Sequence, residues 1–207
     1  MNKIMLLAVT AAVGAAFALP TMAMAEDIPV HLIPRPEFAG SIQGSNPVLE
    51  TVGGLEVKCE KITGSVSWES STTGSLNLSF QGNCIGTGGV SCSEIKTSNL
   101  PFHFLTMVDG TPGVLITPSS SGVFAKFTCS FLTFEIKGNG LVGTAVASCG
   151  GSTSSIIINF EELLGTQLDR QVKGTETIYH LTANSEEVGL KASVFFSFGN
   201  LGTIECT

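Results

Sequence analysis

Apolar and polar residues alternate along most of the chain. Ile62, Val66 and Trp68 stand on even numbers with Thr or Ser between them, and the same alternation returns over residues 75–80. A period of two is the pattern of a half-buried β-strand. The polar stretch 70–74, which ends in glycine, separates the two runs, so we predict an antiparallel hairpin here.

Most of the remaining chain has the pattern of further short strands. The longest alternation runs from 188 to 198, whereas helical patterns are confined to 160–164 and 184–187. The chain also contains 24 glycines and many Ser and Thr residues. We therefore predict an all-β fold, an antiparallel sandwich or barrel of roughly ten strands stabilised by disulfides. The other predicted strands are 55–60, 102–108, 113–117, 123–136, 141–149, 155–160, 176–182 and 202–206.

The run from 123 to 136 changes phase within itself. Apolar residues stand on odd numbers up to Phe131 and on even numbers from Leu132 onward. A shift of one residue turns every following side chain to the other face of a strand. We predict a β-bulge or bend at Phe131–Leu132, so that the two halves can serve different sheets or a barrel corner.

The N-terminal residues have the three-part pattern of an export signal. A lysine supplies the charge, residues 4–19 are apolar, and Ala23-Met24-Ala25 is the small-x-small site that a peptidase reads. We predict that residues 1–25 are a signal peptide of bacterial type that is removed. An uncleaved anchor is the alternative, because residues 4–25 approach the length of a membrane span. Pro20 and the Ala-rich composition fit a signal better.

Two parts follow the predicted cleavage site. Residues 26–47 contain four prolines, among them Pro34, Pro36 and Pro47, and we predict an extended leader. Residues 48–207 are predicted to form a single β domain, since their number suits one domain. No stretch after the signal is long and apolar enough to span a bilayer as a helix.

The chain is acidic, with 17 Asp and Glu against 10 Lys and Arg and a formal net charge of −7. Phosphate contacts need clustered cations, and no run of Lys or Arg is present, so the sequence argues against nucleic acid as a partner. An anionic membrane surface is disfavoured for the same reason. The acidity is compatible with cationic partners, although solubility alone also accounts for it.

An even number of cysteines in an exported chain indicates disulfides. No C-x-x-C is present and the nearest two cysteines are eight residues apart, so we predict no metal site. The six cysteines, all after the predicted cleavage site, are Cys59, Cys84, Cys92, Cys129, Cys149 and Cys206.

Six cysteines allow 15 pairings, and spacing favours one of them. Cys84–Cys92 would close a short Gly-rich loop. Cys129–Cys149 would join two strands across a hairpin turn at Gly138-Asn139-Gly140. Cys59–Cys206 would remain and tie the start of the domain to its end.

Gly138, Gly140 and Gly143 spell G-x-G-x-x-G. In dinucleotide-binding proteins the pyrophosphate lies at the N-terminus of a helix that follows this motif. Residues 141–149 alternate like a strand instead. We therefore predict a turn at this motif and no bound cofactor.

No pattern identifies a catalytic site. His31, His103 and His180 lack metal-ligand spacing and no H-E-x-x-H occurs, so we predict exposed histidines. The nucleophile elbow G-x-S-x-G is absent, and oxidised cysteines disfavour a catalytic thiolate. The adjacent carboxylates Glu161-Glu162 and Glu186-Glu187 are predicted to be surface charge rather than the paired acids of a glycosidase.

Three further residues have a structural and a functional interpretation. Trp68 and Tyr179, each the only residue of its kind, would form a sugar-binding platform if they were exposed. Trp68 shares a strand face with Ile62 and Val66, which favours the core. Asp109 stands in the sequence Asp-Gly-Thr-Pro-Gly and is predicted to be a turn residue.

Part of the cysteine frame resembles that of a known group of proteins. The relevant residues are Cys59, the segment 80–84 (Phe-Gln-Gly-Asn-Cys), Cys92 and the segment 127–129 (Phe-Thr-Cys). In these residues the chain resembles a group of uncharacterised secreted bacterial β-rich proteins, over roughly residues 55–150. The resemblance implies a β fold with disulfides, and it implies no activity and no site residues.

These observations favour a non-enzymatic exported module, secreted, periplasmic or on the cell surface, that binds an extracytoplasmic ligand or protein or forms part of a surface. The alternative is a secreted hydrolase of envelope polymers, with a site that folding assembles from distant residues such as His103 or His180 and a carboxylate. A third hypothesis is a polymer subunit that donates residues 26–47 to a neighbour.

Overall fold

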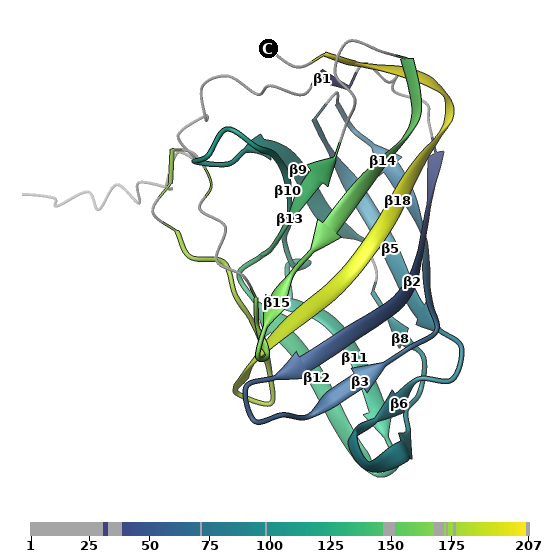
Figure 1. The fold of residues 1–207 in the computed structure, drawn as a ribbon, viewed down its shortest axis with the longest axis vertical. Coiled ribbons are helices and arrows are strands. Elements are labelled where there is room, and N and C mark those ends of the chain that lie inside the picture. Colours follow the sequence, from purple (N-terminus) through teal and green to yellow (C-terminus); the bar gives the residue numbers. More distant parts are fainter. Residues whose placement is uncertain are drawn as a thin grey trace, which may run out of the picture.

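The computed structural model describes residues 31–32, 39–70, 72–97, 99–146, 152–167, 172, 174–175 and 177–205. Nearly all strands in these ranges belong to one large antiparallel sheet (Figure 1), and β15 and β16 form a small separate hairpin. The helical element among the described residues is a short 3-10 turn, η1 (Thr87–Gly89). The prediction of an all-β antiparallel fold is confirmed. No described helix has the length and hydropathy of a membrane span.

The strands are more numerous than expected, and several contain only two or three residues. Their bounds are β1 (His31–Leu32), β2 (Ala39–Thr51), β3 (Glu56–Lys58), β4 (Lys61–Trp68), β5 (Thr73–Gln81), β6 (Ile85–Gly86), β7 (Val90–Ser91), β8 (Ile95–Lys96), β9 (Leu100–Thr106), β10 (Pro112–Ile116), β11 (Val123–Cys129), β12 (Leu132–Gly138), β13 (Leu141–Val146), β14 (Ser152–Phe160), β15 (Glu162–Leu163), β16 (Thr166–Gln167), β17 (Leu181–Ala183) and β18 (Glu186–Glu205).

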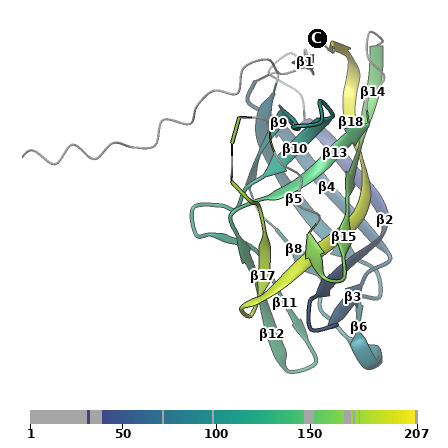
Figure 2. The ribbon, with the colours of Figure 1, turned by 60° about the vertical axis from the view of Figure 1, so that its left-hand side comes forward.

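Four strands, β5, β4, β2 and β18, pair in that order and form a wall along the whole molecule. Two separate paths of pairing lead from β5 back to β18. One runs through β9, β10, β13 and β14, and the other through β8, β11, β12 and β17. Figure 2 shows the first set above the second, and we call the two regions the upper half and the lower half.

The predicted hairpin of residues 62–80 is confirmed as β4 and β5. Val66 faces Leu76 and Ile62 faces Phe80, so the apolar positions of both strands share the buried face. Gly74 stands opposite Trp68. A Cβ atom on Gly74 would lie 2.8 Å from the ring of Phe102, so the absence of a side chain there makes room for the aromatic core.

Strand β2 begins at Ala39, within the stretch predicted to be an extended leader. It lies between β4 and β18, so the predicted domain boundary at residue 47 falls inside a strand of the main sheet. Asn46 (φ 49°) and Pro47 form a bulge where the register with β18 shifts between Lys191 and Ser193. A proline has no N–H to donate, and a bulge is where a strand tolerates one. Pro47 therefore marks an irregularity within a strand, and the other three prolines of the predicted leader lie outside the described residues.

The chain reverses its direction at the phase change at Phe131–Leu132. The predicted position of an irregularity is therefore correct, but the structure has a hairpin turn there instead of a bulge or bend. Cys129 pairs with Leu132, which leaves Ser130 and Phe131 as the turn, with Ser130 at a φ of 54°. Positive φ is typical of two-residue hairpin turns. Because the chain reverses, apolar residues of opposite parity in β11 and β12 share one face, as Phe127 and Phe134 do.

Residues 138–140 form a crossover between the two halves, and the predicted hairpin turn is wrong. β12 pairs with β11 and β17, whereas β13 pairs with β10 and β14. The side-chain amide of Asn139 donates to the carbonyl of Ile178 at 2.8 Å, and its oxygen accepts from the His180 N–H at 2.9 Å. The segment after Gly140, which contains the last glycine of the motif, is strand β13, as its alternation indicates, and not the helix that a dinucleotide site needs.

The predicted disulfide pairing is wrong. The bonds are Cys59–Cys84 and Cys92–Cys129, which overturns both pairs predicted with Cys149 and Cys206, two residues outside the described part. Cys84 and Cys92 do lie opposite each other, since the Cys92 N–H donates to the Cys84 carbonyl at 2.8 Å. Their sulfur atoms bond instead to Cys59, which follows β3, and to Cys129 on β11. Pairing between strands from distant parts of the sequence brings these closer partners.

The C-terminal strands also differ from the prediction. In the predicted strand 176–182, residues 177–180 lie outside strands and residues from 181 onward belong to β17. The predicted strand 188–198 and residues 202–205 of the last predicted strand are parts of one long strand, β18. A single strand of this length can pair with both halves, and β18 pairs with β14 above and β17 below.

Candidate functional site

A ring of strands, some short and some long, surrounds the lower end of the molecule. Strands β2, β3, β6 and β7 pair in series on one side, and β11, β12, β17 and β18 pair on the other, with β18 joined back to β2. Between β7 and β11 the ring is closed by the β-bridge and disulfide of Cys92 and Cys129. In Figure 1, β3, β6, β11 and β12 lie at the bottom of the ribbon, where the lower ends of β2 and β18 meet them.

This ring encloses an apolar pocket with a volume of about 220 Å³. Its lining side chains are mostly aliphatic or aromatic, and the polar groups, Thr51, Glu56, Thr87 and Ser130, are few. We call this cavity the end pocket. The apolar residues that line it are Leu49, Leu55, Val57, Val90, Phe127, Phe131, Leu132, Phe134, Ile136, Ala183 and Val188.

Large apolar side chains stand exposed at the mouth of the end pocket. The exposed fraction is 85% for Phe131, 55% for Leu132 and 47% for Leu55. Exposed apolar surface gathered around a cavity is typical of an interaction site, whereas single exposed apolar residues are common. The mouth is therefore the strongest candidate for a functional surface in the described part of the chain.

The sequence pattern does not single out Phe131 as a site residue, but it contains a signal. Phe131 and Leu132 are consecutive apolar residues at the phase change. In a two-residue turn neither side chain has a fixed place on the buried face. An aromatic residue at such a turn is a candidate for a surface contact.

A second, larger depression adjoins the end pocket. It is open, has a volume of about 920 Å³, and is lined by Glu50, Glu56 and Glu60 together with Lys58 and the glycine-rich segment 86–89. Glu56 lines both this depression and the end pocket. We call the depression the acidic groove. Apolar and acidic surfaces thus meet at Glu56.

Hydrogen bonds hold the boundary between groove and pocket in place. The N–H of Glu56 donates to Thr87 Oγ1 at 2.7 Å, which ties β3 to η1. Glu56 also forms an ion pair of 2.8 Å with Lys58, and the Asn83 amide donates to Glu60 at 2.6 Å. The disulfide Cys59–Cys84 lines the groove. Both disulfides of the described part therefore lie at this end of the molecule.

The predicted candidates for catalysis lie elsewhere. His103 is exposed on β9 and His180 is exposed just before β17, and neither lines the end pocket or the acidic groove. His31 belongs to β1. Glu186 and Glu187 are exposed, as predicted, and so is Glu161, whereas Glu162 is partly buried. No cluster of three metal-binding side chains occurs within the described ranges.

Asp109, Trp68 and Tyr179 have structural roles. Asp109 Oδ1 accepts from the Thr111 N–H at 2.9 Å in the β9–β10 turn, as predicted for a turn residue. Trp68 is buried against Phe102 and Phe104, so its assignment to the core is confirmed. Tyr179 is half-buried against a small apolar cluster that includes Met107 and Val142, and burial raises the pKa of its hydroxyl.

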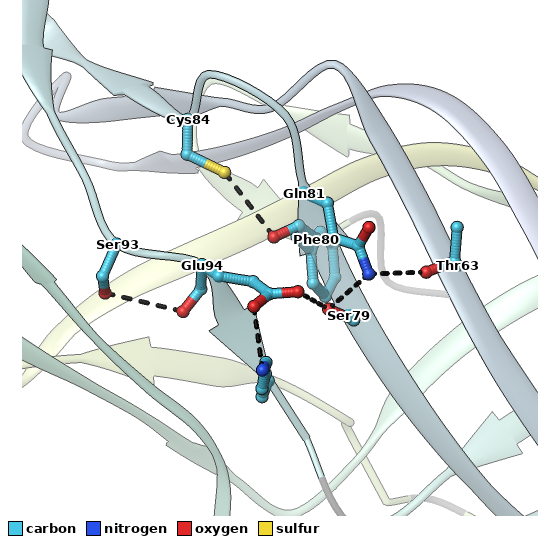
Figure 3. A network of polar contacts seen from close by, with 8 residues as sticks. Thr63, Ser79, Phe80, Gln81, Cys84, Ser93 and Glu94 are labelled. Carbon is cyan, nitrogen blue, oxygen red and sulfur yellow. Dashed lines mark hydrogen bonds and ion pairs between the residues drawn. The ribbon is translucent and has the colours of Figure 1, made fainter.

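A polar network joins β4, β5 and the segment before β8 (Figure 3) and deserves comparison with a hydrolase site. The Ser79 hydroxyl donates to the Glu94 carboxylate, and Glu94 pairs with Lys96 at 2.9 Å. The hydrogen bonds from Lys96 and Ser79 lower the pKa of Glu94. A carboxylate whose pKa is lowered is a weaker general base. The network therefore fits an exposed contact between strands better than a site that activates Ser79.

The chain has no match among known protein families, curated proteins or solved structures. The assignment of the candidate site therefore rests on the geometry of the structure.

Proposed function

We propose that this protein is an exported, non-enzymatic binding module that holds an apolar group of an extracytoplasmic ligand in the end pocket. The observation that carries the proposal is the ring-enclosed apolar cavity with Phe131, 85% exposed, at its mouth. An apolar cavity that opens to solvent gains free energy when an apolar group enters it.

The volume of the end pocket sets the size of that group. Pockets for drug-sized ligands measure about 300–1,000 Å³, and an apolar cavity of about 150 Å³ binds benzene. At about 220 Å³, the end pocket fits one aromatic ring or one branched aliphatic chain. Full burial of such a group contributes roughly 1.5–3 kcal/mol, so a ligand needs further contacts outside the pocket for firm binding.

Two features support an extracytoplasmic location. Residues 1–25 have the pattern of a signal peptide, and the two disulfides fit an oxidising compartment such as the bacterial periplasm or the exterior. The same disulfides stabilise the end that we assign to binding. The competing hypothesis, a secreted hydrolase, finds less support, because His103 and His180 are exposed and lie outside the end pocket.

Titration with toluene, observed through methyl NMR signals, tests the proposal. We expect shifts at Leu49, Val57 and Val188, which line the end pocket, and none at Val66 or Val114 in the core. An absence of shifts at millimolar toluene would contradict the proposal.

Substitutions of two exposed phenylalanines add a matched comparison. Phe131→Ser removes part of the pocket mouth and should weaken toluene binding about fivefold, since it removes roughly 1 kcal/mol of apolar contact. Phe195→Ser removes a phenylalanine that is 50% exposed on β18 and lies outside the end pocket. It should leave toluene binding unchanged. Equal weakening by both variants would show that Phe131 has no special role.

A further inference from the structure

The acidic groove limits what kind of ligand can extend out of the end pocket. Among the described residues, three carboxylates, those of Glu50, Glu56 and Glu60, line it together with one ammonium group, that of Lys58. Lys58 is paired with Glu56, and none of the ion pairs found among the described residues involves Glu50 or Glu60. The groove therefore presents negative charge directly beside an apolar cavity.

Lys191 lines an adjoining depression together with Glu50, Glu56, Glu161 and Glu162, so the charge around the groove stays negative. Lys126 and Lys137 do not offset this charge either. Both pair with Glu135 at 2.6 Å on the β11–β12 hairpin, and none of these three residues lines the groove. A cleft lined by one sign of charge attracts groups of the opposite sign. The expected ligand is thus positive next to its apolar group.

We propose that the occupant of this end is a peptide segment with one large apolar side chain flanked by Lys or Arg. The apolar side chain enters the end pocket, and the flanking cations lie along Glu50, Glu56 and Glu60 in the groove. This inference depends on the proposed function, since it names the class of ligand for the same pocket. A groove of about 920 Å³ beside a pocket of about 220 Å³ suits a chain that inserts a single side chain.

Two other occupants fit less well. In the predicted leader, the part before β2, residues 26–38, carries Glu26, Asp27 and Glu37 against Arg35, so donation of this segment by a second copy would bring mainly like charges together. A long acyl chain exceeds an end pocket of about 220 Å³, which is below the usual range for ligands of that size.

Fluorescence anisotropy with short labelled peptides tests the inference. The probes are Gly-Lys-Phe-Lys-Gly, Gly-Ser-Phe-Ser-Gly, Gly-Glu-Phe-Glu-Gly and Gly-Lys-Ala-Lys-Gly, all with blocked ends. We expect the Lys-Phe-Lys probe to bind about tenfold more tightly than Ser-Phe-Ser at low salt, as a few exposed ion pairs allow. This advantage should shrink at about 0.5 M salt, because screening weakens exposed ion pairs.

Variants locate the effect. Glu50→Gln combined with Glu60→Gln should remove most of the advantage of Lys-Phe-Lys over Ser-Phe-Ser, while toluene binding stays unchanged. Glu60 precedes β4, whereas Glu69 follows β4 at its far end and is exposed. Glu69→Gln should therefore change neither the preference for Lys-Phe-Lys nor toluene binding.

The outcomes separate this inference from the proposed function. If toluene and Ser-Phe-Ser bind but the charged probes show no preference, the ligand class is wrong and the pocket assignment stands. If Lys-Ala-Lys binds as well as Lys-Phe-Lys, charge alone drives binding and the inference is overturned. If octylammonium binds while every peptide fails, the ligand is a small amphiphile and the peptide assignment is wrong. If toluene itself does not bind, the proposed function fails first.

Discussion

The upper and lower halves share one wall of strands, yet they fill their interiors differently. In the upper half Trp68, Phe102, Phe104 and Phe196 form a continuous aromatic cluster, with ring centroids 5.0–6.4 Å apart, and all four side chains are buried. In the lower half Phe127 and Phe134 stack at 5.2 Å on one side of a cavity that stays open. The difference shows that closed pairing of strands does not by itself fill the space inside.

The size of the inward side chains accounts for the difference. At the lower end the wall and its neighbours contribute Leu49, Ala183 and Val188 to the interior, and these are smaller than the aromatic residues above. A cavity lined by apolar atoms reduces stability, because those atoms lack contacts on one side. Two disulfides stabilise the lower half, whereas aromatic packing stabilises the upper half.

The largest expected effect comes from Phe102→Ala. Phe102 is 0% exposed and contacts three aromatic rings, so its truncation should reduce the free energy of unfolding by about 3–5 kcal/mol. Phe131→Ala, at the open mouth, should change it by less than about 0.5 kcal/mol. Urea denaturation measures both. A similar loss for the two variants would show that the mouth is packed in solution and would remove the contrast between the halves.

Removal of either disulfide should give the next largest loss of stability. The two removals should differ in their effect on toluene binding. In the chain-entropy model, loops of 37 and 25 residues contribute about 3–4 kcal/mol each. The double variants Cys92→Ala/Cys129→Ala and Cys59→Ala/Cys84→Ala should therefore lose similar amounts of stability in urea.

Toluene binding should distinguish the two disulfide variants. Loss of Cys92–Cys129 opens the ring between β7 and β11, and we expect binding to weaken at least about tenfold, as at other sites whose geometry is no longer preorganised. Loss of Cys59–Cys84 leaves that closure intact and should weaken binding about threefold at most. Equal weakening would mean that the ring closure does not shape the pocket.

Two alanine-to-valine substitutions should change the free energy of unfolding in opposite directions. Ala183 lines the end pocket and Ala145 lies on β13 in the upper half, and both are 4% exposed. Ala183→Val fills empty space and should raise stability by about 1 kcal/mol. Ala145→Val adds the same atoms to a packed core and should lower stability by about 1–3 kcal/mol. Thermal and urea unfolding of both variants give the comparison, and destabilisation by Ala183→Val would argue against an empty pocket.

The sequence predicts much of this fold because alternation is a local property. The hairpin of Val66 and Leu76 and the buried position of Trp68 follow from residues that are neighbours in the chain. The disulfides could not be predicted in the same way, since Cys92 meets Cys129 only because β11 folds back beside β7. Pairing of distant strands depends on the whole set of competing contacts, and spacing in the chain does not describe it.

The candidate site was harder to predict for a related physical reason. The end pocket is made from eight strands that span residues 49–188, and most of its apolar lining residues alone look like ordinary core. What makes a site is the space that these side chains leave empty. Among these apolar residues, Phe131, an aromatic residue at a phase change, differs locally from a core position.

The smallest expected effect concerns the β11–β12 hairpin, which forms one side of the open end. Lys126 and Lys137 hydrogen-bond Glu135 and lower the pKa of its carboxyl below 4.5, the usual value. A group with a lowered pKa in the folded state stabilises that state above the unfolded pKa and loses this contribution as the pH falls through the folded pKa. We therefore expect a slight loss of stability below pH 4.5, and Glu135→Gln should remove this part of the pH dependence.

NMR titration of the Glu135 carboxyl tests this mechanism directly. In the Lys126→Gln/Lys137→Gln variant the titration midpoint should move upward, because both donors that favour the charged form are gone. The two lysines lie outside the end pocket, so toluene binding at neutral pH should stay unchanged in the variant. If the midpoint stays where it was, the ion pairs do not form in solution. If the midpoint moves and toluene binding also weakens, the outer face of the hairpin helps to hold the open end in shape, and the lower half depends on exposed charges in a way that the upper half, with its aromatic interior, does not.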